Sequence, residues 1–328
     1  AQLCLVQVAT GSEVLVVDPL ASGDLEPFWD VLLAREWVSH SARQDIEVVY
    51  QSAARMPAAL FDTQVAAALL GHPPQLGYAG LVKALFDVDL PKSHTRANWA
   101  ARPLPEAFLA YAAEDVEFLL PARERLASEL DRKGRLAWAE ADSALLLDPA
   151  LYATDPDGSV FRLKSLKSLT GTRRAAAAAL AAWRETEAMQ RNLPRQWILK
   201  DAVLTDIAVR QPASARELER IEGLPPRTVK RAGPAILEAV AAAVAATGHV
   251  AGDEPRRARR GGPDERQKAL LQALQTRIAA CASDLGLAAE TIASRKELTA
   301  VILEGERESR LFTGWRRELI GNDIAKML

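Results

Sequence analysis

The change near residue 150 from alternating strand and helix patterns to helix patterns alone constrains the fold of this chain most strongly. Period-two apolar runs predict strands, and apolar residues three or four apart predict helices. Thr10-Gly11-Ser12 separates the first two strands and is a hairpin signal. The alternation predicts an α/β domain whose mixed sheet, flanked by helices, is antiparallel at its start and parallel later. The predicted strands are Leu3–Val8, Glu13–Val17, Trp37–His40 and Ala59–Asp62, and the predicted helices are Leu25–Arg35, Asp45–Ser52, Gln64–Leu70, Leu81–Phe86 and Glu106–Leu130.

The chain after residue 150 is predicted to be all-helical and to hold two small domains of one type. The segment Ala175–Trp183 is rich in Ala, the best helix former, and is expected to be a helix. Residues 248–263 are rich in Gly, Pro and Arg and are predicted to form a linker. The segments on either side, from Ile198 and from Ile292 onward, share the spacing of their apolar residues, as a diverged repeat does. We therefore expect domains at 1–148, 155–247 and 264–328.

Charge is distributed unevenly along the chain, although the net charge is only −2. Residues 1–150 hold 12 Lys and Arg against 21 Asp and Glu, a balance of −9, whereas residues 151–263 hold 19 against 12, a balance of +7. An acidic first part and a basic middle part suggest separate tasks, metal chemistry in one and capture of a polyanion in the other. Ordinary surface variation explains the same counts equally well.

The cysteines and histidines argue against several classes of site. Cys4 and Cys281 are far apart, and the four histidines lack zinc-ligand spacing, so neither a disulfide framework nor a zinc site is expected. A metal ion, if bound, would be a hard cation held by carboxylates. No apolar run reaches the roughly 18 residues of a membrane span, and the first residues lack a basic n-region. We expect a cytoplasmic protein.

Acidic side chains and a tyrosine in the first domain have the placement of a metal site. Asp45 lies early in a helix directly after a strand, and Asp62 ends another strand, where ligands of α/β sheets collect. Tyr111 and Asp115 are four residues apart on a helix and share a face. Such carboxylates suit Mg²⁺ or Mn²⁺, a pair of which can stabilise both oxygens of a phosphodiester displacement. Taken singly, each Asp is better explained as an N-cap or a solvated residue, and Tyr111 as a core ring with a wet hydroxyl.

Six segments together resemble the ribonuclease D family of DEDD exonucleases. They are HSARQDIEVV, FDTQVAAALLG, LPKSHTRANWAARPL, YAAEDVEFLLP, RNLPRQWILKDAVL and SRKELTAVILEGERESRLFTGWRRELIG. The segments follow the family's order, and the resemblance extends over nearly the whole chain. The resemblance implies a ribonuclease H-like exonuclease domain followed by two all-α HRDC domains. With two C-terminal helical domains, the chain resembles the bacterial enzymes more than their exosome-associated eukaryotic relatives.

The resemblance also implies roles for particular residues. Asp45 would be the acidic residue of the second exonuclease motif, and Asp115 the metal-ligating acid of the third. Tyr111 would align the nucleophilic water, which makes this the tyrosine subtype. His40 lies where relatives often have a residue near the site, and a buried structural histidine is the stronger alternative.

Other residues of the family block have less certain roles. Lys92, Trp99 and Arg102 precede the third motif, and Arg102 is expected either to contact the RNA backbone or to form a structural salt bridge. Asn98 replaces the Asp usually found before this Trp and receives no role. The family's first motif, Asp-x-Glu, would lie just upstream of Ala1. We expect a preceding segment to supply it, because the chain without it would be inactive and its sheet incomplete.

Basic residues in the middle domain are candidates for binding RNA. Arg191, Arg195 and Lys200 cluster around a helix start, and Glu217–Pro225 resembles a helical hairpin that presents backbone N–H groups to phosphate. A solvated basic face is the alternative. Three tryptophans are expected to be core anchors rather than base-stacking platforms: Trp183, Trp197 and Trp315.

The sequence thus predicts a monomeric hydrolase that uses two divalent cations to trim RNA, such as tRNA precursors, from the 3′ end. A non-catalytic RNA-binding module, if the first motif is absent, and a DNA-directed exonuclease of the same superfamily are the alternatives. Comparing the hydrolysis of RNA with that of DNA of equal length tests the DNA-directed alternative, since recognition of the 2′-OH distinguishes the two substrates.

Overall fold

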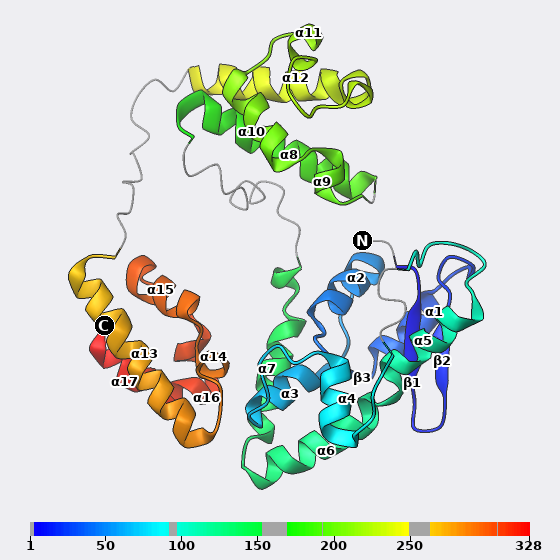
Figure 1. Cartoon of the computed structure of the whole chain (residues 1–328), viewed down its shortest axis with the longest axis vertical. Helices are drawn as coiled ribbons and strands as arrows, with labels where there is room; N and C mark the ends of the chain where they lie inside the picture. The colour runs from blue at the N-terminus through cyan, green and yellow to red at the C-terminus, as the bar shows by residue number, and fades with distance from the viewer. Residues whose placement is uncertain (1–2, 92–96, 153–168, 192, 249–262, 307) are drawn as a thin grey trace. The chain divides into compact units, whose positions relative to one another are not determined.

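A computed structural model describes residues 3–91, 97–152, 169–191, 193–248, 263–306 and 308–328 (Figure 1). The chain divides into two compact units, and each is described by itself. The larger unit holds residues 3–152 together with 263–328, and the middle unit holds residues 169–248. No helix of the described residues is both long enough and apolar enough to cross a membrane.

Four short strands form two separate ladders in the larger unit. β1 (Val6–Ala9) pairs antiparallel with β2 (Val14–Val17), and β3 (Glu36–Ser39) pairs parallel with β4 (Ala59–Asp62). The predicted antiparallel start and parallel continuation are therefore present. Among the described residues the two pairs are not hydrogen-bonded to each other, so the expected mixed sheet appears as two ladders. In the second ladder Ser39 lies opposite Asp62, which brings the C-terminal ends of β3 and β4 together.

Helices cover these strands, and most of them begin within three residues of the predicted starts. Their bounds are α1 (Glu26–Leu33), α2 (Arg43–Ala53), α3 (Thr63–Leu69), α4 (Tyr78–Phe86), α5 (Glu106–Glu117), α6 (Leu119–Arg132) and α7 (Leu136–Ala144), followed by 3₁₀ turns at Leu145–Leu147 and Pro149–Leu151. Helix α5 packs against β1 and β2, and α7 packs against β4. Each of the two ladders is thus covered by a helix from later in the chain.

The predicted single helix Glu106–Leu130 is wrong, because it breaks at Phe118 into α5 and α6. The hydroxyl of Tyr78 lies between the two backbone groups that would form the helical bond there. It accepts from the N–H of Phe118 at 3.0 Å and donates to the carbonyl of Glu114 at 3.4 Å. A side chain inserted into the backbone ladder is a known cause of a helix break. The break places Pro121, which lacks an N–H, in the first turn of α6, where a proline is tolerated.

The last part of the chain is helical and belongs to the larger unit. Its elements are α13 (Glu265–Leu285), α14 (Ala289–Ile292), α15 (Arg295–Glu304), a 3₁₀ turn (Arg310–Phe312), α16 (Gly314–Arg316), a π-helical turn (Arg317–Gly321) and α17 (Asn322–Met327). Buried apolar residues of α13 to α17 belong to the same core cluster as those of α3 and α6. The main hydrophobic core of the larger unit therefore joins β4, α3 and α6 to the last helices of the chain.

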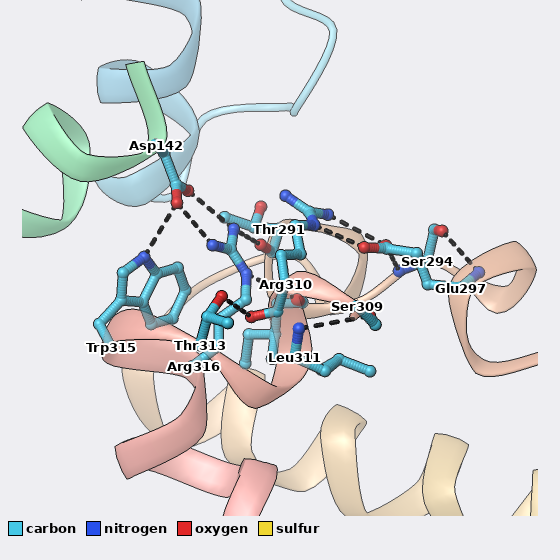
Figure 2. Close-up of polar contacts among 11 residues, drawn as sticks. Asp142, Thr291, Ser294, Glu297, Ser309, Arg310, Leu311, Thr313, Trp315 and Arg316 are labelled. Atoms are coloured by element: carbon cyan, nitrogen blue, oxygen red, sulfur yellow. Dashed lines mark hydrogen bonds and ion pairs between the residues drawn. The ribbon is translucent and has the colours of Figure 1, made fainter. Parts of the chain in front are cut away.

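A buried ion pair joins α7 to α16 within this unit (Figure 2). Both oxygens of Asp142 accept from the Arg316 guanidinium, at 2.6 and 2.7 Å, and Arg316 also donates to the carbonyls of Thr291 and Ile292. The indole N–H of Trp315 donates to the same carboxylate at 3.1 Å. The ring of Trp138 stacks on that of Trp315, with centroids 4.4 Å apart and planes 5° from parallel.

The backbone also approaches closely between α3 and α13. Gly71 has a φ of +103°, and a Cβ built on it would lie 2.6 Å from the carbonyl oxygen of Gly286. The guanidinium of Arg135 donates to the carbonyls of Leu69 and Leu285 at 2.9 and 2.8 Å. Glycine is therefore required at position 71 both for the backbone angle and for the approach.

The middle unit is an independent helical domain with its own core. Its helices are α8 (Gly171–Gln190), α9 (Arg195–Ile198), α10 (Asp201–Arg210), α11 (Ala215–Leu218) and α12 (Pro226–Gly248), so the predicted Ala-rich helix is confirmed. Buried Leu180, Leu204, Ile207, Leu218 and Ile236 form its centre. The expected helical hairpin is present as α11 and α12, joined by a turn in which Gly223 has a φ of +77°.

Candidate active site

The carboxylate of Asp62 organises the C-terminal ends of β3 and β4. It is 2 % exposed and accepts from the backbone N–H groups of Ser41 and Ala42, at 3.1 and 2.8 Å, which form the turn into α2. It also caps α3 by accepting from the N–H of Gln64 at 2.8 Å and that of Val65 at 3.4 Å. The N-cap interpretation of Asp62 is therefore confirmed. Its structural consequence is that the turn before Asp45 is held to the end of β4.

Asp45 lies in the first turn of α2, directly after this organised turn. The crowding of protein around the carboxyl, together with the charges of Asp62 and Asp115, raises its pKa to about 6. The side chain is nevertheless open to solvent, so water screens this repulsion and reduces the free energy that the shift represents. Three carboxyl groups from separate elements thus share one electrostatic environment, which a bound cation would stabilise.

Asp115 and Tyr111 approach from α5, one helical turn apart. Desolvation and the neighbouring Glu114 raise the pKa of Asp115. Desolvation and the charges of Asp115 and Glu114 raise the pKa of the Tyr111 phenol as well. This phenol therefore stays protonated at neutral pH and keeps a hydrogen to donate.

Tyr111 is held in place by an aromatic neighbour from the family block. The ring of Trp99 stacks on Tyr111 with centroids 6.2 Å apart and planes 29° from parallel, and it also contacts Phe108 at 5.5 Å. Arg102 fixes the backbone of this segment by donating to the carbonyls of Trp99 and Ala101, both at 2.8 Å.

The remaining donors of Arg102 are also used within the protein. Its Nε and Nη2 donate to the two oxygens of Asp18, at 2.6 and 2.5 Å, and Nη2 also donates to the carbonyl of Cys4. All five N–H groups of this guanidinium therefore have protein acceptors. The observation supports the salt-bridge alternative for Arg102. Lys92, the other cation predicted to bind RNA in this block, lies outside the described residues.

His40 is half-buried and bonded through both ring nitrogens. Nε2 lies 2.8 Å from the carbonyl oxygen of Leu76, which can only accept, so Nε2 carries a hydrogen. Nδ1 lies 2.9 Å from the hydroxyl of Thr63. Burial lowers the pKa of His40, and the neutral ring satisfies both contacts. These contacts support the structural alternative, in which His40 ties β3 to the loop before α4.

The cations predicted in the middle unit surround α9. Arg191 ends α8 and lies 3.6 Å from Glu187, Arg195 begins α9, and Lys200 precedes α10. Of the predicted core tryptophans, Trp315 is buried and Trp183 is half-buried against the core, but the prediction for Trp197 is wrong. Trp197 is 75 % exposed, because the adjacent Ile198 takes the inward-facing position of α9.

Two residues that support this site were missed from the sequence. Tyr78 holds the end of α5 as described above, and its own pKa is raised to about 12 by burial, with a contribution from Asp115. The hydroxyl of Ser143 accepts from the backbone N–H of Asp62 at 3.0 Å. No spacing in the sequence connects Tyr78 with Phe118 or Ser143 with Asp62, since the paired residues are 40 and 81 positions apart.

The described donors fit a hard divalent cation in their chemistry. Asp45 and Asp115 offer carboxylate oxygens that are accessible to solvent, and carboxylate oxygens are the ligands that such a cation prefers. Within the described ranges no group of three or more His, Cys, Asp or Glu side chains is close enough to hold a metal ion by itself. Two carboxylates supply fewer oxygen ligands than Mg²⁺ or Mn²⁺ takes, so a cation bound here would need further ligands.

Comparisons with known proteins agree with this geometry. Residues 1–131 match the family model of a 3′-5′ exonuclease, and residues 173–240 match that of the HRDC domain. Ribonuclease D of Gluconacetobacter diazotrophicus is 41 % identical over 98 % of this chain and 82 % of its own length. Ribonuclease D of Acidiphilium cryptum is 38 % identical over 99 % of this chain and 83 % of its own length.

Solved structures give the same relationship. The crystal structure of Escherichia coli RNase D matches with a TM-score of 0.86 and 27 % identity, over all of this chain and 88 % of that one. The catalytic core of RRP6 from Trypanosoma brucei matches with a TM-score of 0.58 and 25 % identity, over 74 % of this chain and 69 % of that one. An exonuclease domain that depends on divalent metal ions, an HRDC domain and close relatives over nearly the whole chain lead to one conclusion: the chain belongs to the ribonuclease D family of 3′-5′ exoribonucleases.

Proposed function

We propose that this exoribonuclease trims the 3′ ends of tRNA precursors and other small structured RNAs and releases 5′-mononucleotides. The observation that carries the proposal is the shared environment of Asp45 and Asp115, with Tyr111 one turn away on α5. The Escherichia coli relative is described as an exoribonuclease involved in structured RNA processing, which supports the choice of substrate.

Asp45 and Asp115 would hold two divalent cations, either Mg²⁺ or Mn²⁺. Such ions, when bound, lower the pKa of a water molecule and stabilise charge on the attacking and leaving oxygens. The oxygen of water forms a bond to the terminal phosphorus while the bond to the 3′-oxygen of the preceding nucleotide breaks. The leaving oxygen takes a proton, which leaves a 3′-hydroxyl on the shortened RNA.

Tyr111 would orient the attacking water rather than remove its proton. Its pKa is raised from an already high value, so the phenol is a poor base at neutral pH and a good hydrogen-bond partner. Stacking on Trp99 limits the ring to one orientation, which in turn limits the directions from which water can be held.

Binding of the RNA would be shared between domains. Arg191, Arg195 and Lys200 would contact phosphates without regard to sequence, as would the backbone N–H groups of the hairpin between α11 and α12. Contacts from His40, Lys92 and Arg102 stay predictions, as do a second HRDC domain at residues 264–328, the monomeric state and the cytoplasmic location.

Hydrolysis of RNA labelled at either end tests the function in the full-length enzyme. With Mg²⁺ or Mn²⁺ present, 3′-labelled RNA should release labelled mononucleotide at once, whereas 5′-labelled RNA should shorten stepwise. Asp45→Ala and Asp115→Ala should each reduce kcat roughly 10²- to 10³-fold, the scale expected for loss of one essential electrostatic group. Both variants should bind RNA as the parent does. Tyr111→Phe should slow turnover with little effect on folding.

Three outcomes contradict the proposal. Unchanged turnover in either aspartate variant refutes the assignment of the site. Binding of RNA without metal-dependent release of nucleotides would make the protein an RNA-binding module, and equal rates on DNA of the same length would make it a general exonuclease.

A further inference from the structure

The surface of α9 combines an exposed indole with nearby cations. Trp197 is 75 % exposed and is the most exposed of the large apolar side chains in the described residues. Scattered exposed apolar residues are normal, but tryptophan is usually highly buried, because leaving an indole in water forgoes a large transfer free energy. The exposure of Trp197 therefore needs a physical reason beyond stability.

The segment that carries Trp197 has cations and no acid. From Ala188 to Lys200 the chain contains Arg191, Arg195 and Lys200 and no Asp or Glu. Among the described residues, neither Arg195 nor Lys200 has an acidic side chain within ion-pair distance. An aromatic ring between cations suits a ligand that has both flat rings and negative charge.

The platform under Trp197 is held firmly. Ile198 and Leu199 are 2 % and 4 % exposed and anchor α9 in the core of the middle unit. The buried guanidinium of Arg184 donates to the carbonyl of Leu199 at 2.8 Å and to the Asp201 carboxylate at 2.6 Å. This ion pair also compensates the charge of Asp201, the nearest acid along the chain, which would otherwise repel a polyanion. A rigidly presented ring loses little conformational entropy when a ligand binds.

We propose that Trp197 stacks on a base of single-stranded RNA while Arg195 and Lys200 contact the flanking phosphates. The inference rests on the proposed function, because it names a residue that holds the RNA during trimming. Base stacking on aromatic side chains is tolerant of sequence, as an enzyme that removes successive nucleotides requires.

Tryptophan fluorescence in the full-length protein tests the proposal without catalysis. A single-stranded oligonucleotide such as oligo(A) is titrated in EDTA, and quenching of emission is followed. Quenching should be lost in Trp197→Phe and retained in Trp183→Phe, the matched control on α8 in the same unit. In the free protein, acrylamide should quench the emission that Trp197→Phe removes.

Affinity and its salt dependence separate stacking from charge. Trp197→Ala should weaken binding of oligo(A) roughly 5- to 100-fold, the range expected for one stacked base, and leave the salt slope unchanged. Trp197→Tyr should restore most of the affinity. Lys200→Ala should reduce the salt slope by about 0.7, the value for one phosphate on a single strand. Thermal melting of Trp197→Ala should match the parent, because the side chain is exposed.

Failure of the stacking proposal can be told apart from failure of the proposed function. Asp45→Ala should bind and quench oligo(A) as the parent does, because the titration is made in EDTA and needs no catalysis, so loss of hydrolysis and loss of stacking are separate results. Parental affinity of Trp197→Ala for oligo(A) would overturn the proposal. Shielding of Trp197 from acrylamide in the free protein would also overturn it, because the indole would then be packed against protein.

Discussion

The surroundings of the Asp45 carboxyl suit it to bind a cation but lower the stability of the folded protein. The pKa of Asp45 is about 6 in the folded protein against an ordinary value of 3.8, so at pH values between these two the folded chain binds more protons than the unfolded chain. The contribution of this carboxyl to stability therefore falls as pH rises from about 4 to about 6. Above pH 6 the folded protein carries the full repulsion of Asp62 and Asp115.

Asp45→Asn should consequently stabilise the metal-free protein at neutral pH. In EDTA at pH 7 we expect the Tm to rise by roughly 2 °C, a small shift because water screens this exposed group. The difference should disappear below about pH 3, where the parent's carboxyl is largely neutral in both the folded and the unfolded state. Addition of Mn²⁺ should raise the Tm of the parent and leave the variant unchanged. A variant that melts below the parent at pH 7 would contradict this account.

Arg102 illustrates a residue whose role the sequence left open between two alternatives. All its donors are engaged with Asp18 and three carbonyls, including that of Trp99, which stacks on Tyr111. Arg102→Gln should therefore lower kcat through misplacement of Tyr111, with the Kd for RNA in EDTA unchanged. A loss of RNA affinity with unchanged kcat would restore the RNA-contact interpretation.

The roles of individual residues could be predicted where they follow from a local sequence pattern or from a family motif. The capping role of Asp62 follows from its place between a strand and a helix. The exposure of Trp197 does not follow from any local pattern. Apolar periodicity makes both Trp197 and Ile198 candidates for the core, and in the structure Ile198 takes the buried position.

At the scale of elements, the strands and most helices agree with the sequence patterns within a few residues, whereas the break between α5 and α6 does not. Apolar periodicity continues through Phe118, and the group that interrupts the helix is a hydroxyl 40 residues away. Pro121 was the local signal, because an uninterrupted helix would place its ring against the preceding turn. Insertion of a side chain from a distant part of the sequence leaves no periodic pattern in the residues of the helix.

Tyr78→Phe tests the importance of the break. Removal of the hydroxyl leaves the N–H of Phe118 and the carbonyl of Glu114 without this partner, which should cost about 1–2 kcal/mol of unfolding free energy in urea. Because Asp115 lies beside the break, kcat should also fall while KM changes little. Tyr152→Phe, whose hydroxyl donates to the carbonyl of Leu146, is the control and should lose stability without losing kcat. Unchanged kcat in Tyr78→Phe would exclude a positioning role.

At the scale of the whole larger unit, the helices after residue 264 share one core with the exonuclease part of the chain. Leu274, Ile278 and Ile324 belong to one apolar cluster with Phe61 and Leu126. The sequence could divide the chain into segments but could not show this sharing, because a helix that is apolar on one face does not reveal which partner covers it. The middle unit, by contrast, has a core of its own.

Asp142→Asn should weaken this assembly by about 3–5 kcal/mol, because it leaves the buried charge of Arg316 without its partner. The double variant Asp142→Leu with Arg316→Met should recover much of the loss. Arg277→Met, which removes the exposed pair with Asp323, is the matched control and should cost less than about 1 kcal/mol. Chemical denaturation of the four proteins gives these differences. An equal loss in the control and in Asp142→Asn would contradict the importance of burial.

The stack of Trp138 on Trp315 has a practical consequence for work in solution. Two indoles with centroids 4.4 Å apart couple electronically, which adds to the circular dichroism a signal that depends on their mutual orientation. Separation of α7 from α16 would abolish that coupling even if every helix stayed intact. The native protein therefore contains an unlabelled chromophore pair that distinguishes undocking of its last helices from their unfolding.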